Sequence, residues 1–263
     1  MSLKQIQKIN IIGTGNVATH LALALTSAGK EVVKIYGRKL QKAIELASKC
    51  NALPTSDIKQ ISDGADLIII AVSDDALGEI LELLPKGNTF VVHTSGSVSM
   101  GILKSHGDNF GVFYPLQTFS KNRDINFSEV PLCLEASSLE NLEILRNLAI
   151  SMTNSIYFID SAQRKKLHLA AVFACNFPNF LYSIAEGLLE ENGLSFEMMK
   201  PLIIETAKKA KAISPKKAQT GPAFRKDKKI IDNHIQMLSE HKDFQEIYEL
   251  LSKKIIGFTG NKR

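Results

Sequence analysis

The sequence predicts an α/β domain built on a mostly parallel sheet, followed by an all-helical C-terminal domain. Up to about residue 159, short apolar runs of strand length alternate with segments whose apolar residues recur at helical spacing. From Asp160 onward, only helical patterns remain. This change divides the 263 residues into two predicted domains, residues 1–159 and 160–263.

The chain opens with a predicted βαβ unit. Lys8–Ile12 is an apolar strand, a helix runs from Asn16 to Ala28, and Glu31–Tyr36 is a second strand. The turn between the first strand and the helix is Gly-rich and spans Gly13–Ala18. A Gly-rich turn in this context is typical of a Rossmann-type dinucleotide-binding domain.

We expect this turn to bind a pyrophosphate. Gly13 allows a sharp turn, Gly15 lets the backbone approach the phosphates, and Ala18 lets helix and strand pack closely. The helix N-terminus adds free N–H groups and a partial positive charge. The alternative is a Rossmann-like scaffold that has lost its ligand or binds another nucleotide. The predicted binding residues here are Gly13, Thr14, Gly15, Asn16 and Val17.

The end of the second strand favours NADP over NAD. Enzymes that prefer NAD place an acidic residue about 20 residues after the glycines, where it binds the ribose 2′-hydroxyl. No acidic residue occurs between Val32 and Ile44, and the turn carries Arg38 and Lys39 instead. These cations suit a 2′-phosphate, which Arg can bind in bidentate fashion. The alternative is a solvated basic turn.

The other elements follow in order. The run Leu67–Val72 is unbroken and indicates a strand buried on both faces of a parallel sheet. A long helix begins at Asp160 or Ser161, and Pro178 should kink it. The remaining predicted strands are Thr89–His93, Gly111–Tyr114, Val130–Leu134 and Ser155–Ile159, and the remaining helices are Leu40–Lys49, Leu77–Leu84, Leu139–Ile150, Leu202–Ile213, Lys228–Leu238 and Phe244–Leu251.

In open α/β sheets, ligands bind outside the carboxyl ends of the strands. Small polar residues follow two further strands here, and we expect them to border the nicotinamide and its ribose. The alternative for Ser95-Gly96-Ser97 is a simple strand-to-helix turn with a Ser cap. The cofactor-binding residues predicted at these two ends are Val72, Ser73, Thr94, Ser95 and Gly96.

Three residues of the helical half are candidate catalytic residues. His168 and Asn176 share an arc of about 80° on an ideal helix and lie roughly 12 Å apart along its axis. His168 could donate a proton near neutral pH, although a single helical His is often only a hydrogen-bonded structural residue. Arg225 follows a Gly-Pro turn and could anchor a carboxylate; alternatively, it belongs to a capped helix start with a surface ion pair.

Composition limits the other possibilities. The net charge is +5, and the densest Lys cluster, within residues 208–217, has no interleaved aromatic residues, so a solvated helix face is favoured over nucleic-acid binding. The six His residues show no metal-site spacing. The apolar run Leu167–Ile184 is interrupted by polar residues and is not expected to span a membrane. Three separated Cys residues in apolar contexts suit buried thiols, and no signal peptide is recognised, so we expect a cytoplasmic protein.

Together these motifs resemble one bacterial family of uncharacterised function, whose members combine a Rossmann-like domain with a helical C-terminal domain and are named as NADP oxidoreductases. The segments that carry the resemblance are the glycine turn, His93–Ser97, Phe113–Phe119, His168 with Asn176, and Gly221–Asp227. The layout is similar to pyrroline-5-carboxylate reductase, deazaflavin-dependent NADP oxidoreductases, β-hydroxyacid dehydrogenases and ketopantoate reductases.

The resemblance implies a homodimer formed with the help of the helical domain, with the active site at the domain junction. It also reveals a departure, since the usual pattern has Gly where this chain has Lys226. The β-hydroxyacid dehydrogenases use a Lys and an Asn four residues apart on the long helix, and this chain has no such pair.

The sequence thus predicts an NADP-dependent oxidoreductase that reduces a small carbonyl or imine compound, such as a 2-oxo acid. The alternative is a non-catalytic dinucleotide-binding protein with a regulatory or interaction role. Nucleic-acid binding ranks last.

Overall fold

A computed structural model describes residues 5–260 of the chain. The chain divides into two compact units, Met1–Asn176 and Phe177–Arg263. The change from alternating strands and helices to helices alone falls earlier, at Asp160 and Ser161. The predicted limits at residues 159 and 160 therefore follow the change in secondary structure, and as domain limits they stay a prediction.

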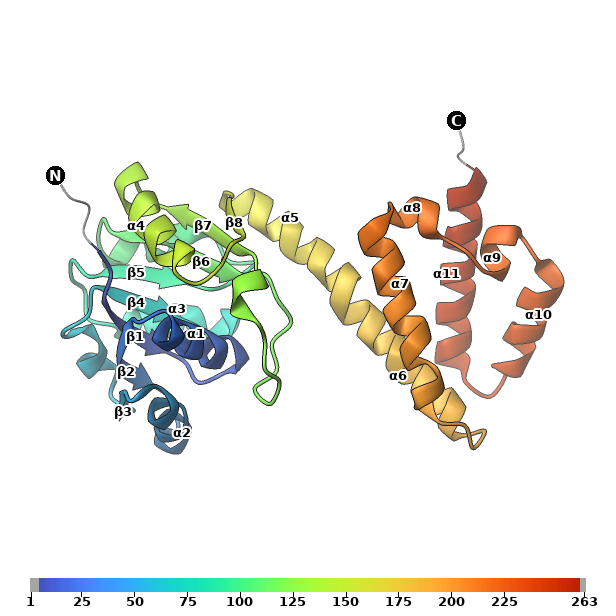
Figure 1. Ribbon diagram of the computed structural model, residues 1–263, viewed down its shortest axis with the longest axis horizontal. Coiled ribbons are helices and arrows are strands. Elements are labelled where there is room, and N and C mark those ends of the chain that lie inside the picture. The colour runs from blue at the N-terminus through green and yellow to red at the C-terminus, as the bar shows by residue number, and fades with distance from the viewer. Residues whose placement is uncertain (1–4, 261–263) are drawn as a thin grey trace. The chain divides into compact units, whose positions relative to one another are not determined.

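The first unit is built on an eight-stranded sheet in the order β3-β2-β1-β4-β5-β6-β7-β8 (Figure 1). All neighbouring strands are parallel except β6 and β7, which pair in antiparallel fashion. The predicted fold class is confirmed. The strands are β1 (Lys8–Ile12), β2 (Glu31–Tyr36), β3 (Leu53–Thr55), β4 (Leu67–Ile70), β5 (Phe90–His93), β6 (Phe110–Pro115), β7 (Leu132–Ala136) and β8 (Ile156–Phe158).

Helices pack on both faces of the sheet. On one face, the core includes residues of α1 (Asn16–Ser27), α2 (Leu40–Cys50) and α4 (Leu139–Ile150). On the other face, it includes residues of α3 (Asp74–Leu83) and of two 3-10 segments, η1 (Ile58–Ser62) and η2 (Met100–His106). The central strand β4 is buried along its whole length, as its unbroken apolar run predicts.

The strand order reverses beside β1, since β2 pairs with one of its edges and β4 with the other. The chain leaves β1 toward β2 and β3 and later crosses back to β4. In doubly wound sheets, such a reversal opens a crevice at the carboxyl ends of the strands. The glycine turn follows β1 directly, so it lies at this crevice.

A long helical stretch follows at Ser161, where Asp160 and Gln163 form a capping box. It consists of α5 (Ser161–Ala171), a π-helical segment η4 (Val172–Asn176) and α6 (Phe177–Glu190). The disturbance predicted near Pro178 takes the form of this π-helical segment, because proline has no N–H to donate to the preceding turn.

The predicted arc of about 80° shared by His168 and Asn176 assumed 3.6 residues per turn throughout. That assumption is wrong, because a π turn closes i→i+5 hydrogen bonds and changes the phase of the helix between the two residues. Asn176, the last residue of η4, is exposed.

The second unit is entirely helical over its described residues. Its elements are α6, a 3-10 turn η5 (Phe196–Met198), α7 (Lys200–Ala212), α8 (Pro215–Ala218), α9 (Pro222–Arg225), α10 (Lys228–Met237) and α11 (Lys242–Gly260). Asp227 caps α10 by accepting from the N–H of Ile230. Lys226 adopts a left-handed conformation with φ 59°, which a Gly would adopt without strain.

Two other sequence expectations are tested by the fold. Cys50 and Cys133 are buried as predicted, but Cys175 is exposed, so that part of the prediction is wrong. Within the described residues, one helix, Ser161–Glu190, is long and apolar enough to cross a membrane by length and composition alone. A single helix of this kind is weak evidence for a membrane span, because helices of soluble proteins pass the same test.

Candidate functional site

Gly13 brings the glycine turn against β4. Its φ is +126°, and a Cβ at this position would lie 2.1 Å from the carbonyl oxygen of Ala71. Its N–H donates to the carbonyl of Tyr36 at 2.9 Å. Both the conformation and the lack of space therefore require glycine, and the turn is fixed between the neighbouring strands β2 and β4.

Gly15 has a different role, because nothing lies within 4 Å of the position where its Cβ would be. It is the N-cap residue of α1, and no side chain of the described residues caps this helix. The first N–H groups of α1 thus face open space, as an anion site requires. Asn16 lines the same space, although its side-chain amide donates to the carbonyl of Phe119 at 2.8 Å.

Three cations gather at the start of α2. Arg38 and Lys39 follow β2, and Lys42 lies in the first turn of the helix. This helix also lacks a side-chain cap among the described residues, and its first turn contains no acidic residue. The helix dipole and the three cations therefore favour the binding of a phosphate group here.

Thr94, Ser95 and Gly96 follow β5 at the next strand end. The N–H of Thr94 donates to the carbonyl of Ile70 at 3.1 Å, which continues the pairing with β4. The hydroxyl of Ser95 accepts from the N–H groups of Ser97 (3.1 Å) and Val98 (2.9 Å). Ser95 thus uses its hydroxyl to hold this turn, and it lines the cleft together with Thr94 and Gly96.

A buried ion pair holds this turn against α5. Arg164 has no exposed surface, and its Nε and Nη2 atoms donate to the carbonyls of Ser95 (3.0 Å) and Val98 (2.6 Å). Its Nη1 pairs with Glu135 of β7, which also accepts from the hydroxyl of Ser161. The guanidinium donates from all three of its nitrogen atoms, and these bonds fix α5 to the turn and to β7.

His168 lies one helical turn after Arg164. Its Nδ1 is 3.1 Å from the hydroxyl of Tyr114 on β6, and the two rings meet edge to face. Burial raises the pKa of Tyr114 to about 12, so its hydroxyl stays protonated. Burial likewise raises the pKa of the neighbouring Cys133 thiol to about 11.

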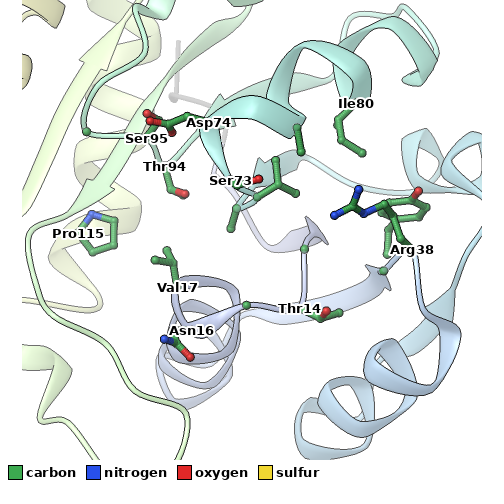
Figure 2. A pocket seen from close by; sticks show the side chains of 18 of the residues that line it. Thr14, Asn16, Val17, Arg38, Ser73, Asp74, Ile80, Thr94, Ser95 and Pro115 are labelled. Atoms are coloured by element: carbon green, nitrogen blue, oxygen red, sulfur yellow. The ribbon is translucent and has the colours of Figure 1, made fainter.

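These features surround one cleft of about 620 Å³, within the range of small-molecule and cofactor sites. Figure 2 shows Arg38 at the far side of the cleft from Thr94, Ser95 and Pro115, with Thr14 between them on the glycine turn. The cleft is lined by every residue predicted to bind the cofactor and by His168; the others that line it are Tyr36, Gly37, Lys42, Ala71, Asp74, Ala76, Glu79, Ile80, Tyr114, Pro115 and Gln117.

Two predicted catalytic residues do not line this cleft. Asn176 is exposed in the π-helical segment, and Arg225 belongs to the second unit, at the end of α9. Within residues 5–260, no group of three or more His, Cys, Asp or Glu side chains could hold a metal ion.

Sequence reasoning missed three residues that shape the site, namely Lys42, Tyr114 and Arg164. Lys42 could have been found, because it lies four residues after Arg38 at a helix start. Tyr114 ends the predicted strand Gly111–Tyr114, so its place at the sheet edge could also have been found. Its pairing with His168 and the pairing of Arg164 with Glu135 could not, because the partners are distant in the sequence.

Two family profiles match the chain. The one described as "NADP oxidoreductase coenzyme F420-dependent" matches residues 8–95, and the domain of unknown function DUF2520 matches residues 130–255. No curated protein shows a significant sequence match to this chain.

Several solved structures are similar over nearly the whole chain. The putative NADP oxidoreductase BF3122 from Bacteroides fragilis is 44% identical with a TM-score of 0.89, covering 95% of this chain and 98% of that one. Protein TM1727 from Thermotoga maritima is 21% identical with a TM-score of 0.72, covering 97% and 99%. An imine reductase from Myxococcus stipitatus, solved with NADP+, is 14% identical with a TM-score of 0.66, covering 94% and 92%.

The last two likenesses show the fold alone, whereas the Bacteroides protein is a close relative along the whole chain. The two profiles agree with it, since they match the dinucleotide-binding half and most of the remainder. The chain therefore belongs to the family of NADP oxidoreductases that joins a dinucleotide-binding domain to the DUF2520 domain.

Proposed function

We propose that the protein uses NADPH to reduce a carbonyl or imine group of a small molecule. The observation that carries this proposal is the cleft itself, which joins a cationic end at Arg38 to an end bordered by Gly96 and His168. The cationic end suits the 2′-phosphate on the adenosine of NADP, and at the other end the imidazole of His168 can exchange a proton.

The residues of the cleft fit NADP. The open space at Gly15 and the uncapped start of α1 suit the pyrophosphate. Arg38, Lys39 and Lys42 would hold the 2′-phosphate, and the backbone at Thr94–Gly96 would border the nicotinamide.

When bound, NADPH supplies a hydride to the substrate carbon. The chain's own residues must then hold the substrate and deliver a proton to its oxygen or nitrogen. His168 is the proposed proton donor because it lines the cleft beside Gly96. Asn176 and Arg225 remain proposed orienting groups for the substrate, with Arg225 as the anchor of a carboxylate.

Two substrate classes are worth testing first. A 2-oxo acid such as ketopantoate would use the carboxylate anchor at Arg225. A cyclic imine is suggested by the fold shared with the imine reductase and with pyrroline-5-carboxylate reductase from Coxiella burnetii, which is 16% identical with a TM-score of 0.57.

The cofactor assignment is tested by calorimetric titration of NADPH and NADH against Arg38→Ala. Loss of one charged hydrogen-bonding partner should weaken NADPH binding by about ten- to hundredfold and change NADH binding little. Lys49→Ala is the matched control, since Lys49 is exposed at the other end of α2 and does not line the cleft. Equal losses for both cofactors would refute a role in binding the 2′-phosphate.

The reaction is tested by following NADPH oxidation with 2-oxo acids, pyrroline-carboxylate, other cyclic imines and a deazaflavin. With a substrate found, His168→Ala should lower kcat by about a hundredfold or more while NADPH affinity is retained. Asn176→Ala and Arg225→Ala should raise KM more than they lower kcat. Unchanged turnover in His168→Ala would remove it as the proton donor.

We also propose that the chain forms a homodimer through its second unit. Large apolar side chains are exposed there, including Phe180 on α6, Leu202 and Ile204 on α7, and Leu250 on α11. Monomeric proteins rarely expose many such side chains together. Light scattering should give twice the chain mass, and Leu202→Glu should reduce it to that of a monomer; a monomeric wild-type protein would contradict the proposal.

A further inference from the structure

Tyr114 and His168 form a side-chain pair that the proposed reaction does not yet use. Tyr114 is the last residue but one of strand β6, is 9% exposed, and contacts His168, which lies 54 residues further along the chain. The hydroxyl oxygen and Nδ1 are 3.1 Å apart, and both residues line the cleft. A buried hydroxyl is ordinarily hydrogen-bonded, and His168 is the partner seen here.

The imidazole of His168 also lies against Gly96. A Cβ at Gly96 would lie 2.7 Å from its Nδ1 and 2.8 Å from its Cγ, so the ring rests directly on the Gly96 backbone. Glycine is needed at this position for space, since only its missing side chain leaves room for the ring. The ring is therefore in contact with both Gly96 and the hydroxyl of Tyr114.

The helix that carries His168 is fixed to the same turn. Arg164, four residues earlier, donates to the carbonyls of Ser95 and Val98, and Glu135 holds its guanidinium. The imidazole is thus positioned by its own contacts with Tyr114 and Gly96 and by the hydrogen bonds that fix its helix. Such support is what a proton-transferring group needs in order to meet its substrate in one geometry.

Burial keeps the phenol of Tyr114 neutral. Burial is the main cause of the raised pKa of Tyr114, with Cys133 and Asp74 adding to it and Arg164 acting against it. A neutral hydroxyl can donate to a bare Nδ1 or accept from Nδ1–H, so the contact itself fits both tautomers. In the imidazolium, Nδ1 carries a proton and the hydroxyl oxygen is its acceptor, and this hydrogen bond favours keeping that proton on Nδ1 when Nε2 releases its own.

We propose that Tyr114 is a positioning residue that holds the proton of His168 on Nδ1, so that Nε2 is the atom that exchanges a proton with the substrate. This inference rests on the proposed function, with NADPH as the reductant. In the reductive direction, the Nε2–H bond of the imidazolium breaks and an O–H or N–H bond forms on the substrate, whose carbon receives the hydride. His168 is left neutral with Nδ1–H still bonded to Tyr114.

The test is a nitrogen-15 NMR titration of His168 in the full-length protein with NADP+ bound and without substrate. Nitrogen shifts distinguish a protonated ring nitrogen from a bare one. In the wild type, neutral His168 should carry its proton on Nδ1; in Tyr114→Phe, most of it should move to Nε2. An unchanged tautomer in Tyr114→Phe would overturn the proposal.

A control variant and the wild type itself keep the test decisive. Tyr157→Phe is the matched control, since Tyr157 is exposed on β8, and it should leave the His168 signals unchanged. If Tyr114→Phe does not fold, the wild type alone decides the question, because a neutral His168 that carries its proton on Nε2 would overturn the proposal. Because the readout needs no turnover, failure to find a substrate would count against the proposed function and leave this inference to the NMR result.

Where a substrate is found, a kinetic readout separates positioning from structure. Tyr114→Phe should lower kcat about tenfold or more and shift its pH profile, with KM for NADPH changed by less than about twofold. An equal loss at every pH would indicate a merely structural role.

Discussion

His93 makes the stability of the first unit depend on pH. It is the last residue of β5, has no exposed surface, and accepts from the N–H of Ser95 through Nδ1 at 3.1 Å. Its Nε2 has no hydrogen-bond partner among the described residues. Burial, followed by the nearby positive charge of Arg164, lowers the pKa of His93 from 6.5 to about 4.

The direction of the pH effect on stability follows from the difference between the pKa of His93 in the folded and in the unfolded chain. The unfolded chain protonates His93 near pH 6.5, whereas the folded chain resists protonation down to about pH 4. The stabilisation is therefore fully present above pH 6.5 and is lost as the pH falls toward 4. The loss should reach about 2 kcal/mol at pH 5 and about 3 kcal/mol below pH 4.

The assay is urea unfolding followed by circular dichroism at pH 7.5 and pH 5, since the chain has no tryptophan. His93→Asn is the comparison, because its side-chain oxygen can still accept from Ser95 and does not titrate. Carboxylates contribute to the pH dependence of both proteins, so the difference between them isolates His93. If His93→Asn loses as much stability at pH 5 as the wild type, the reasoning is refuted.

Three further variants separate the roles of single residues. Lys226→Gly should raise the free energy of unfolding by about 0.5–1 kcal/mol, because it relieves a left-handed backbone at φ 59°. Gly15→Ala should leave the melting temperature unchanged but weaken NADP binding at least about tenfold, since its methyl group points into open space where the pyrophosphate would lie. Gly13→Ala should instead prevent stable folding, because its methyl group would meet Ala71. Arg164→Met should cost about 3 kcal/mol or more by leaving Glu135 unpaired, and Glu135→Leu in the same chain should recover much of that loss.

Each of these has its own contradicting result. If Lys226→Gly unfolded at a lower urea concentration than the wild type, the backbone at this position would not be strained. Gly15→Ala would exclude a phosphate at the glycine turn if cofactor affinity stayed the same, and a cooperative melt of Gly13→Ala at the wild-type temperature would contradict the packing seen here. If the free energy of unfolding of Arg164→Met equalled that of the wild type, the ion pair would contribute nothing to stability.

Local patterns predicted most of the first unit. The bounds of β1 and β2 match the prediction because each is an apolar run of strand length with a clear turn on either side. Strand β3 was missed, since it has three residues and contains Pro54, which disfavours a strand. The π-helical segment was also missed, because only the way the chain accommodates Pro178 decides between a kink and a π turn.

The candidate site could be predicted only where local sequence patterns reveal it. Gly15 and Arg38 each follow the end of a predicted strand, and they could be predicted because the fold class fixes where the strand ends meet. Side-chain pairs between distant segments are set by packing in three dimensions. Tyr114 with His168 and Arg164 with Glu135 are of this kind, so no spacing rule could find them.

The three cations at the start of α2 all belong to one continuous peptide of five residues, Arg38–Lys42. The choice between NADPH and NADH as electron donor would then depend on this one short segment of the chain. Because Thr94–Gly96 and His168 lie on other elements, replacing the segment would change the electron donor without changing the substrate that is reduced.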